Sequence, residues 1–188
     1  MLKYIEEFKK YVAITGFRNV KIGNADNFLK TIKEKKSINV DVQFFDAKFV
    51  ATWQHLYFAV LNALKAFKNR ENISKSLGME IMLYASAQRQ ISRALEMMGV
   101  KDGTKNMAVV VVGDDSKDVE SALTMISEQI DGEQDDKVLE LWNGKTDIVQ
   151  KTFQISEIEI DTVMKKGDFE KALVDLVIER VALLATER

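Results

Sequence analysis

Every residue from Met107 to Val112 is apolar, and this short run sets the tightest limit on the fold. Successive side chains of a strand point to opposite faces of its sheet. A strand that is apolar at every position therefore has to be covered on both faces. We expect Met107–Val112 to be a central strand of the protein.

Other segments carry different strand patterns. Tyr11–Thr15 is rich in β-branched and aromatic residues and ends at Gly16. Val40–Phe45 alternates with a period of two, which is typical of a half-buried strand. Two short runs, Ile81–Ala85 and Ile148–Phe153, are also predicted to be strands, the second of them the last in the chain.

The helical pattern is clearest between Lys48 and Lys68, where apolar residues recur at intervals of three and four and predict one long amphipathic helix. Its apolar stripe consists of Phe49, Trp53, Leu56, Val60, Leu64 and Phe67. The same spacing predicts helices over Gln88–Met98, which ends at Gly99, and over Asp114–Ile130.

Capping residues mark two more helices. Asn24 or Asp26 can begin one of them, and Asp168 is the expected N-cap of the last, which spans Asp168–Thr186. Residues 131–144 are polar and hard to place. A few apolar side chains there indicate a short helical turn that docks on the core, namely Val138, Leu139, Leu141 and Trp142.

These elements predict an α/β (α+β) fold. The strands are separated sometimes by one helix and sometimes by two, which favours a central mixed or antiparallel sheet with helices packed on it. A chain of 188 residues with 46% hydrophobic content can bury one core. Because no proline, linker or repeat interrupts the order, we expect a single domain over residues 1–188.

Composition restricts the chemistry. The chain has no cysteine, so a disulfide framework, a thiolate nucleophile and cysteine-ligated metals are excluded. No apolar run is long enough to span a bilayer, and the charged N-terminus lacks the apolar region of a signal peptide. We expect a cytoplasmic protein without membrane contact. The net charge of −2 predicts no general affinity for nucleic acid, so RNA binding would require a local patch.

Motifs of catalysis and of cofactor binding are missing. The chain contains no phosphate-binding loop, dinucleotide-binding turn, paired-histidine zinc helix or nucleophile elbow. Its one histidine, His55, is predicted to point away from the apolar stripe, as a surface or boundary residue. The acidic pairs Asp114/Asp115 and Asp135/Asp136 are interpreted as solvated surface and not as metal ligands. We expect no catalytic residue, no metal and no cofactor.

One segment of interest runs from Glu80 to Gly99, with Arg89 and Arg93 four residues apart on the predicted helix. A strand-to-helix turn at Ser86 would offer backbone N–H groups to an anion, and two guanidinium groups could hold phosphates. Equally, Ser86 or Gln88 could simply cap the helix, with the arginines paired to Glu96 or solvated. An enzyme using Ser86, Tyr84 and Arg89 is a further alternative.

The C-terminal helix is apolar over an unusually wide arc. One stripe, formed by Phe169, Leu173, Leu176, Val177 and Leu184, is expected to face the core. Val174, Ile178 and Val181 lie toward the other side. This helix is either central to the fold or covered by another chain, which could be a second copy in a homodimer.

These two segments carry a resemblance to a known family. The pattern Glu-Ile-x-Leu-Tyr-x-Ser-x-x-Arg-Gln-Ile-x-x-Ala-Leu-x-x-x-Gly over Glu80–Gly99, and the ending Leu173–Leu184, resemble archaeal members of the regulatory subunit family of the KEOPS complex. The eukaryotic counterpart is TPRKB, the p53-related protein kinase-binding protein. The order of elements is also similar, including Val42-x-Phe44-x-Asp46 before the long helix.

The resemblance implies an α/β protein without catalytic activity. Such a protein binds and supports the atypical kinase/ATPase subunit of KEOPS, and helps to recruit tRNA by its single-stranded 3′ end for threonylcarbamoyladenosine formation at position 37. From the residues themselves we predict a partner-binding set, which is Ile91, Leu95, Val174, Ile178 and Val181. The predicted RNA-binding set is Arg70, Lys75, Arg89 and Arg93.

Overall fold

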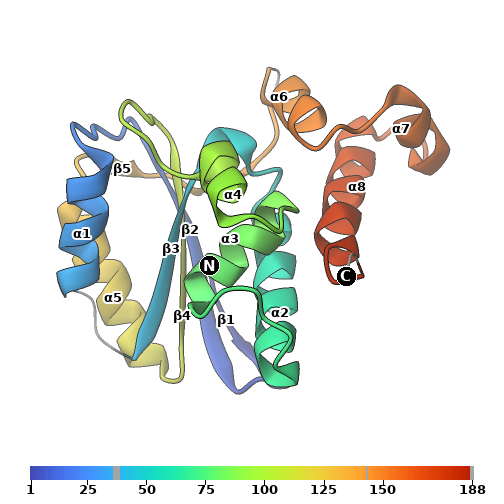
Figure 1. Ribbon diagram of the computed structural model, residues 1–188. Coiled ribbons are helices and arrows are strands. Elements are labelled where there is room, and N and C mark those ends of the chain that lie inside the picture. The colour runs from blue at the N-terminus through green and yellow to red at the C-terminus, as the bar shows by residue number, and fades with distance from the viewer. Residues whose placement is uncertain (36–38, 143, 187–188) are drawn as a thin grey trace.

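The computed structural model describes residues 1–35, 39–142 and 144–186 (Figure 1). The strands are β1 (Leu2–Ile5), β2 (Lys10–Arg18), β3 (Val40–Asp46), β4 (Met107–Gly113) and β5 (Glu133–Gln134). The α-helices are α1 (Ala25–Lys35), α2 (Trp53–Asn69), α3 (Leu77–Ser86), α4 (Ile91–Met98), α5 (Ser116–Gln129), α6 (Lys145–Thr152), α7 (Glu157–Val163) and α8 (Phe169–Leu183). Two 3₁₀ turns are η1 (Ala47–Phe49) and η2 (Asp136–Leu139).

The sheet has the strand order β1-β2-β4-β3, and β5 adds a short pairing to β2. Each of the pairings is antiparallel, and Val112 of β4 lies opposite Val12 of β2 and Asp41 of β3. The predicted α/β fold is thereby confirmed, with an antiparallel sheet. The short strands β1 and β5 had no prediction from the sequence.

Strand β4 is central and completely buried, as its composition predicts. Its valines alternate between two apolar clusters, with Val109 and Val111 in one and Val110 and Val112 in the other. Helices α1 and α5 cover the first face of the sheet, and α2 and α3 cover the second (Figure 1). Helix α8 forms a further layer outside α2 on that second side.

The predicted helical turn is η2, which packs against β2 with Val138 and Leu139 buried. Leu141 is half-buried, and Trp142, which was also expected on the core, is 50% exposed. One oxygen of Asp136 accepts hydrogen bonds from the Thr15 hydroxyl at 2.8 Å and from the Gly16 N–H at 2.9 Å. The docking also depends on the absence of a side chain at Gly16, where a Cβ atom would lie 2.3 Å from Val138 Cγ2.

Two of the predicted strands are wrong. Ile81–Ala85 lies inside helix α3, and Ile148–Phe153 falls mostly in helix α6. Every residue from Glu80 to Ser86 is buried, because α3 contacts α2, α4, α8 and β3. A short helix covered all round shows no amphipathic period, so its apolar run resembles that of a buried strand.

Helix boundaries are confirmed in part. Asp168 caps α8, where it accepts from the Lys171 N–H at 3.0 Å, and Asn24 accepts from the Asn27 N–H at 2.7 Å at the start of α1. The helix predicted from Lys48 begins at Trp53, after η1 and the cap Thr52. The helix predicted from Gln88 begins at Ile91. Among the described helices, none has the length and apolar character needed to cross a bilayer.

Candidate protein- and RNA-binding surfaces

The sequence predicts that Val174, Ile178 and Val181 form an outer flank of α8, but only two of these side chains reach the surface. Val174 and Ile178 are half-buried side chains at the surface. Val181 is 0% exposed and belongs to the core, which corrects its place in the predicted partner-binding set. The helical angle alone places Val181 near Val174, but the residues packed against α8 enclose it.

Helix α2 contributes aromatic side chains beside this flank. Trp53 and Tyr57 meet edge to face with ring centroids 6.0 Å apart, and Tyr57 meets Phe58 in the same way at 6.3 Å. Phe58 is 40% exposed, and Trp53, Tyr57 and Leu61 are half-buried. The sequence pattern assigned Trp53 to the core stripe and did not single out the others.

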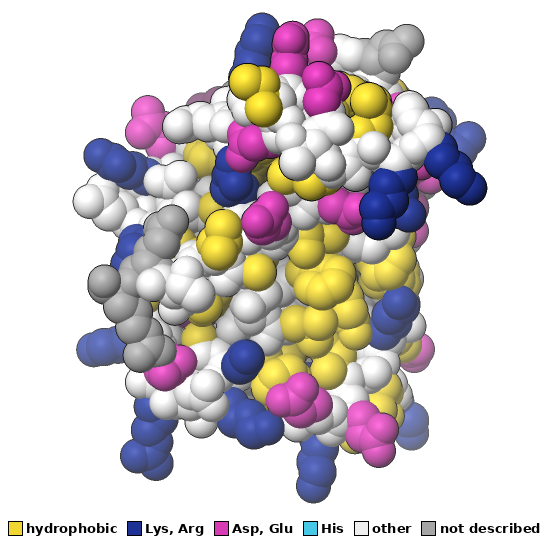
Figure 2. All heavy atoms as spheres, turned by 90° about the vertical axis from the view of Figure 1, so that its right-hand side faces the viewer, with side chains coloured by type: hydrophobic (Ala, Val, Ile, Leu, Met, Phe, Trp, Pro, Cys, Tyr) yellow, Lys and Arg dark blue, Asp and Glu magenta, His cyan; other side chains and the backbone are white. Residues whose placement is uncertain are grey.

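A groove connects the two helices. Trp53 and Gln54 of α2 line it together with Lys171 and Val174 of α8, and Leu141 of the segment before α6 borders it. Figure 2 shows hydrophobic side chains gathered over the face of the molecule on which α2 and α8 lie. We define the aromatic face as Trp53, Tyr57, Phe58, Leu61, Val174 and Ile178.

A cation lies over one side of the aromatic face. The Lys3 amino group from β1 is 4.4 Å from the Trp53 ring centroid and 5.2 Å from that of Tyr57. The groove itself carries the carboxylates of Glu140 and Glu170. An apolar centre with charged groups at its border is the usual composition of a protein-binding surface.

The other predicted partner-binding residues lie on α4. Ile91 and Leu95 are 41% and 38% exposed, while Ala94 and Met98 on the opposite side of the helix are buried. They are solvent-facing, as a binding role requires. They belong to a different helix from the aromatic face, which has no residue from α4.

The loop between α3 and α4 differs from the predicted strand-to-helix turn. Ser86 ends α3, and its buried hydroxyl donates to the carbonyls of Met82 and Leu83 at 2.8 and 3.1 Å. Ala87 then adopts the left-handed conformation with φ of 49°. Beside this loop is a hollow of about 240 Å³, lined by Ser86, Ala87, Gln88, Thr152, Phe153, Gln154 and Arg180.

Arg180 is a basic residue of this hollow that has no prediction from the sequence. It comes from α8 and forms an ion pair with Glu159 of α7. The hydrogen bond from the Ser156 backbone, followed by that from Arg180, lowers the pKa of Glu159 to about 2. The sequence did not predict that Arg180 lies at this hollow, because α8 and the α3–α4 loop are distant in the chain and meet only in the folded protein.

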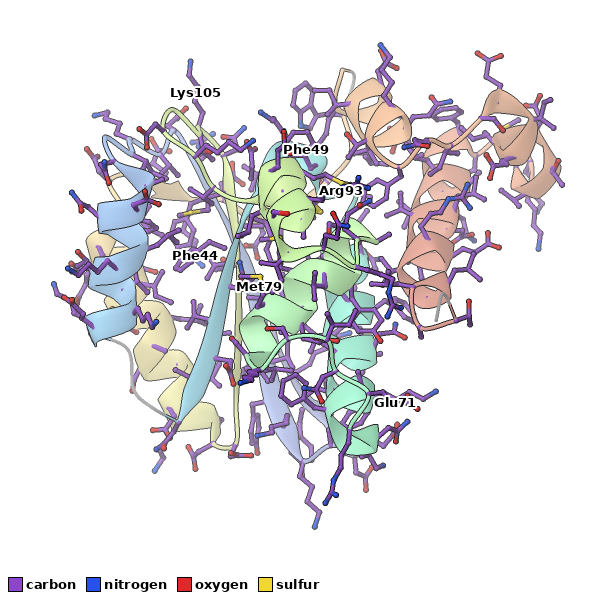
Figure 3. All side chains as sticks on the ribbon, viewed as in Figure 1. Phe44, Phe49, Glu71, Met79, Arg93 and Lys105 are labelled. Atoms are coloured by element: carbon purple, nitrogen blue, oxygen red, sulfur yellow. The ribbon has the colours of Figure 1, made fainter. Side chains whose placement is uncertain are left out.

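The four predicted RNA-binding residues are exposed but fall into two places. Arg89 precedes α4 and Arg93 lies in its first turn, so both are at one end of α3. Arg70 ends α2 and Lys75 precedes α3, which places them at the other end of that helix. Figure 3 shows this separation, with Arg93 in the upper part of the molecule and Glu71, the neighbour of Arg70, in the lower part.

His55 is buried, which corrects the predicted surface position. Its Nδ1 accepts from the Ala51 N–H at 3.2 Å, so Nε2 carries the proton and donates to the Ala85 carbonyl at 2.7 Å. Burial lowers the pKa of His55 to about 4. Since both ring nitrogens are occupied by the backbone, His55 is not arranged as a base for the Ser86 hydroxyl.

Lys145 is a second enclosed group near His55. Its amino group donates to the carbonyls of Val138 and Glu140 at 2.7 and 3.0 Å, which fixes the C-terminal end of η2. Burial lowers the pKa of Lys145 to about 7, and the carboxylates of Glu140 and Asp46 partly oppose this effect. The sequence offered no signal for a buried lysine.

The acidic pairs have structural partners. Asp115 and Asp135 cap α5 and η2, and Asp114 pairs with Lys10 at 2.7 Å. Within the described ranges, no group of three or more histidine and carboxylate side chains is arranged to hold a metal ion.

Comparison with known proteins gives two matches. The model of the family described as "Kinase binding protein CGI-121" matches residues 17–185. The "Regulatory protein Cgi121" of Methanocaldococcus jannaschii is 31% identical over 175 residues, which cover 93% of this chain and 98% of that protein. The similarity therefore includes α2, the α3–α4 loop and α8.

Proposed function

Because the chain belongs to the CGI-121 family of kinase-binding proteins, we propose that it is the non-catalytic regulatory subunit of a KEOPS complex. In this role it binds and supports the atypical kinase/ATPase subunit. It also helps to recruit tRNA by the 3′ end for formation of threonylcarbamoyladenosine at position 37. We expect it to act in the cytoplasm.

The observation that carries the kinase-binding part is the aromatic face. Protein interfaces concentrate their binding energy in a few large side chains that lose water on association, and tryptophan and tyrosine are the most frequent among them. Here the rings of Trp53, Tyr57 and Phe58 meet in sequence. Trp53 lines a groove with Val174, and α2 packs against α8, which also carries Ile178. We assign the kinase subunit to this surface, with Ile91 and Leu95 of α4 as a second candidate contact.

The test is Ile178→Glu, with Ile158→Glu as its control. Ile158 on α7 is 78% exposed and lies outside the aromatic face, so it receives the same change without touching the surface. Ile178→Glu is expected to keep the circular dichroism spectrum and to weaken kinase binding by about 2 kcal/mol or more, roughly thirtyfold. The control is expected to bind as the wild type does.

If Ile178→Glu does not fold, Phe58→Ala tests the same surface with a milder change. If the folded variant, Ile178→Glu or Phe58→Ala in its place, binds the kinase subunit with wild-type affinity, the aromatic face is not its site. The mass of the isolated protein in solution distinguishes a homodimer formed through this face.

The RNA-binding part rests on the α3–α4 loop. Unpaired bases stack on aromatic or guanidinium groups with about 1 to 3 kcal/mol each, so a few residues suffice on a protein with a net charge of −2. Arg89 directly follows Gln88, which lines the hollow with Arg180, and Arg93 lies in the first turn of α4; both are exposed. Arg70 and Lys75 would need an RNA segment that reaches the other end of α3.

The RNA assignment is tested with Arg89→Glu/Arg93→Glu. This double variant is expected to weaken binding of full-length tRNA, and removal of the 3′ end from the tRNA is expected to weaken wild-type binding similarly. Arg70→Glu/Lys75→Glu makes the same change of charge at the other end of α3. Unchanged binding by the Arg89/Arg93 variant would remove these residues from the site.

A further inference from the structure

A second group of basic side chains lies where β4 begins. Lys48 is in η1, and Lys101 and Lys105 are in the connection from α4 to β4. All three are exposed, and they line a hollow of about 340 Å³. Lys105 and Phe49 lie at the upper end of the molecule in Figure 3, the end at which Arg93 is also found.

Two carboxylates share this hollow, but each is held by the protein itself. Asp46 is buried and accepts from the Lys48 N–H at 3.2 Å, and its other oxygen lies 3.2 Å from the Lys48 amino group. Asp102 accepts from the Ala25 N–H at 2.8 Å at the start of α1. Both acids therefore fix the backbone that presents the lysines.

Lys101 and Lys105 are exposed and line the hollow with positive charge that no carboxylate of the described residues neutralises. In the described part of the chain, neither forms an ion pair, and the Lys101 amino group donates only to the Glu96 carbonyl. Lys48 adds a third amino group, 4.7 Å from the centroid of the Phe49 ring. An open, polar hollow with lysines suits phosphate oxygens, which fix position without reading sequence.

We infer that Lys48, Lys101 and Lys105 bind the phosphate backbone of the paired part of the tRNA, an inference that rests on the proposed RNA function. Helix α4 connects the two basic groups, with Arg89 and Arg93 at its start and Lys101 just beyond its end. Its length is about 12 Å at 1.5 Å per residue. An RNA whose single-stranded end lies at the α3–α4 loop then continues along α4 to the second group.

The experiment compares Lys101→Glu/Lys105→Glu with Lys33→Glu/Lys117→Glu. Lys33 near the end of α1 and Lys117 at the start of α5 are exposed, and Lys117 follows the end of β4, the opposite end of that strand. Each double variant changes the net charge equally. Binding is measured from 50 to 200 mM salt with full-length tRNA and with a short single-stranded RNA that has the sequence of its 3′ end.

Lys101→Glu/Lys105→Glu is expected to weaken full-length tRNA binding about tenfold or more at 100 mM salt. The slope of log affinity against log salt should become shallower by about 1.8, because each phosphate contact contributes about 0.9. Binding of the short RNA and of the kinase subunit should stay unchanged, and the Lys33/Lys117 control should bind both RNAs normally.

The outcomes separate this inference from the function on which it rests. If the Lys101/Lys105 variant binds full-length tRNA with wild-type affinity and salt slope, the inference is overturned, while the effect of Arg89→Glu/Arg93→Glu still supports RNA binding. If the variant loses the kinase subunit and keeps tRNA, the hollow binds protein. If the wild type binds neither RNA, the proposed RNA function fails and the inference with it.

Discussion

Two ionisable side chains, His55 and Lys145, are enclosed close together and are held by backbone groups. His55 joins the start of α2 to the end of α3, and its ring meets that of Phe153 edge to face at 5.3 Å. Lys145 joins the start of α6 to the C-terminal end of η2. Both groups stabilise connections between elements, and burial disfavours the charged form of each.

His55 predicts a loss of stability in acid. Its folded pKa of about 4 lies below the ordinary 6.5, so the unfolded chain binds more protons between these values and stability falls as the pH falls through them. Between pH 7 and pH 4.5 the loss from this group is about 2 kcal/mol. Urea unfolding of the wild type and of His55→Gln measures it.

The His55→Gln variant should be less stable at pH 7 and should lose less stability on acidification. Glu159, with its lowered pKa, adds a loss of its own in both proteins as the pH falls below about 4.5. The prediction therefore concerns the difference between the two curves above that pH. Parallel curves would show that His55 does not titrate differently in the folded protein.

Lys145 predicts the same direction of pH dependence in a higher pH range. Its folded pKa of about 7 lies below the ordinary 10.5, so the unfolded chain binds more protons in this window and stability rises with pH across it. Lys145→Met keeps an unbranched side chain, one atom shorter, and removes the titrating group. The wild type should gain stability from pH 7 to pH 9 relative to the variant, measured by thermal unfolding in matched buffers.

At the scale of elements, the contact between β2 and η2 depends on Gly16. A Cβ atom there would lie 2.7 Å from the Asp135 carbonyl oxygen, which is backbone and cannot rotate away. Gly16→Ala is expected to destabilise the protein by about 1 to 3 kcal/mol. Gly23→Ala is the control, because a Cβ atom at Gly23 has no neighbour within 4 Å. Equal urea midpoints for the two variants would contradict the close approach.

The sequence predicts elements well where one face of each is solvated. Helices α2, α5 and α8 each keep a solvated side, and β4 shows its central position through composition alone. The alternating pattern located β3 correctly, although the burial of its side chains does not alternate. Prediction fails where an element is covered all round, as α3 is, because the period disappears. It also fails at α6, where short apolar spacing does not distinguish a helix from a strand.

The sequence predicts the candidate binding surfaces less well than it predicts the fold. Val174, Ile178, Ile91 and Leu95 are at the surface as predicted, but Val181 is enclosed by residues distant in sequence. The aromatic face was missed because Trp53 was assigned to the core stripe and the other α2 members lie beside that stripe. Whether such a side chain is buried depends on which helix covers it, and α8 leaves part of α2 open.

At the scale of the whole molecule, binding of the kinase subunit should raise the thermal stability. A ligand that binds only the folded state adds about 2.7 kcal/mol when present at 100 times its dissociation constant. For a chain of this size that raises the melting temperature by about 2 to 4 °C per kcal/mol. Scanning calorimetry should show the increase for the wild type and for Ile158→Glu. A similar increase with Ile178→Glu would place the partner elsewhere.

The position of β4 has a consequence for the order in which the chain folds during synthesis. Strands β2 and β3 both pair with β4 and not with each other, and β4 spans residues 107–113. The N-terminal half leaves the ribosome without the strand that joins its sheet, so Val12, Ile14 and Phe45 lack their native neighbours in the meantime. Contacts between residues so distant in sequence form slowly and leave apolar surface exposed to aggregation. A nascent chain stalled before Met107 should therefore bind chaperones, and one stalled after α5 has emerged should release them.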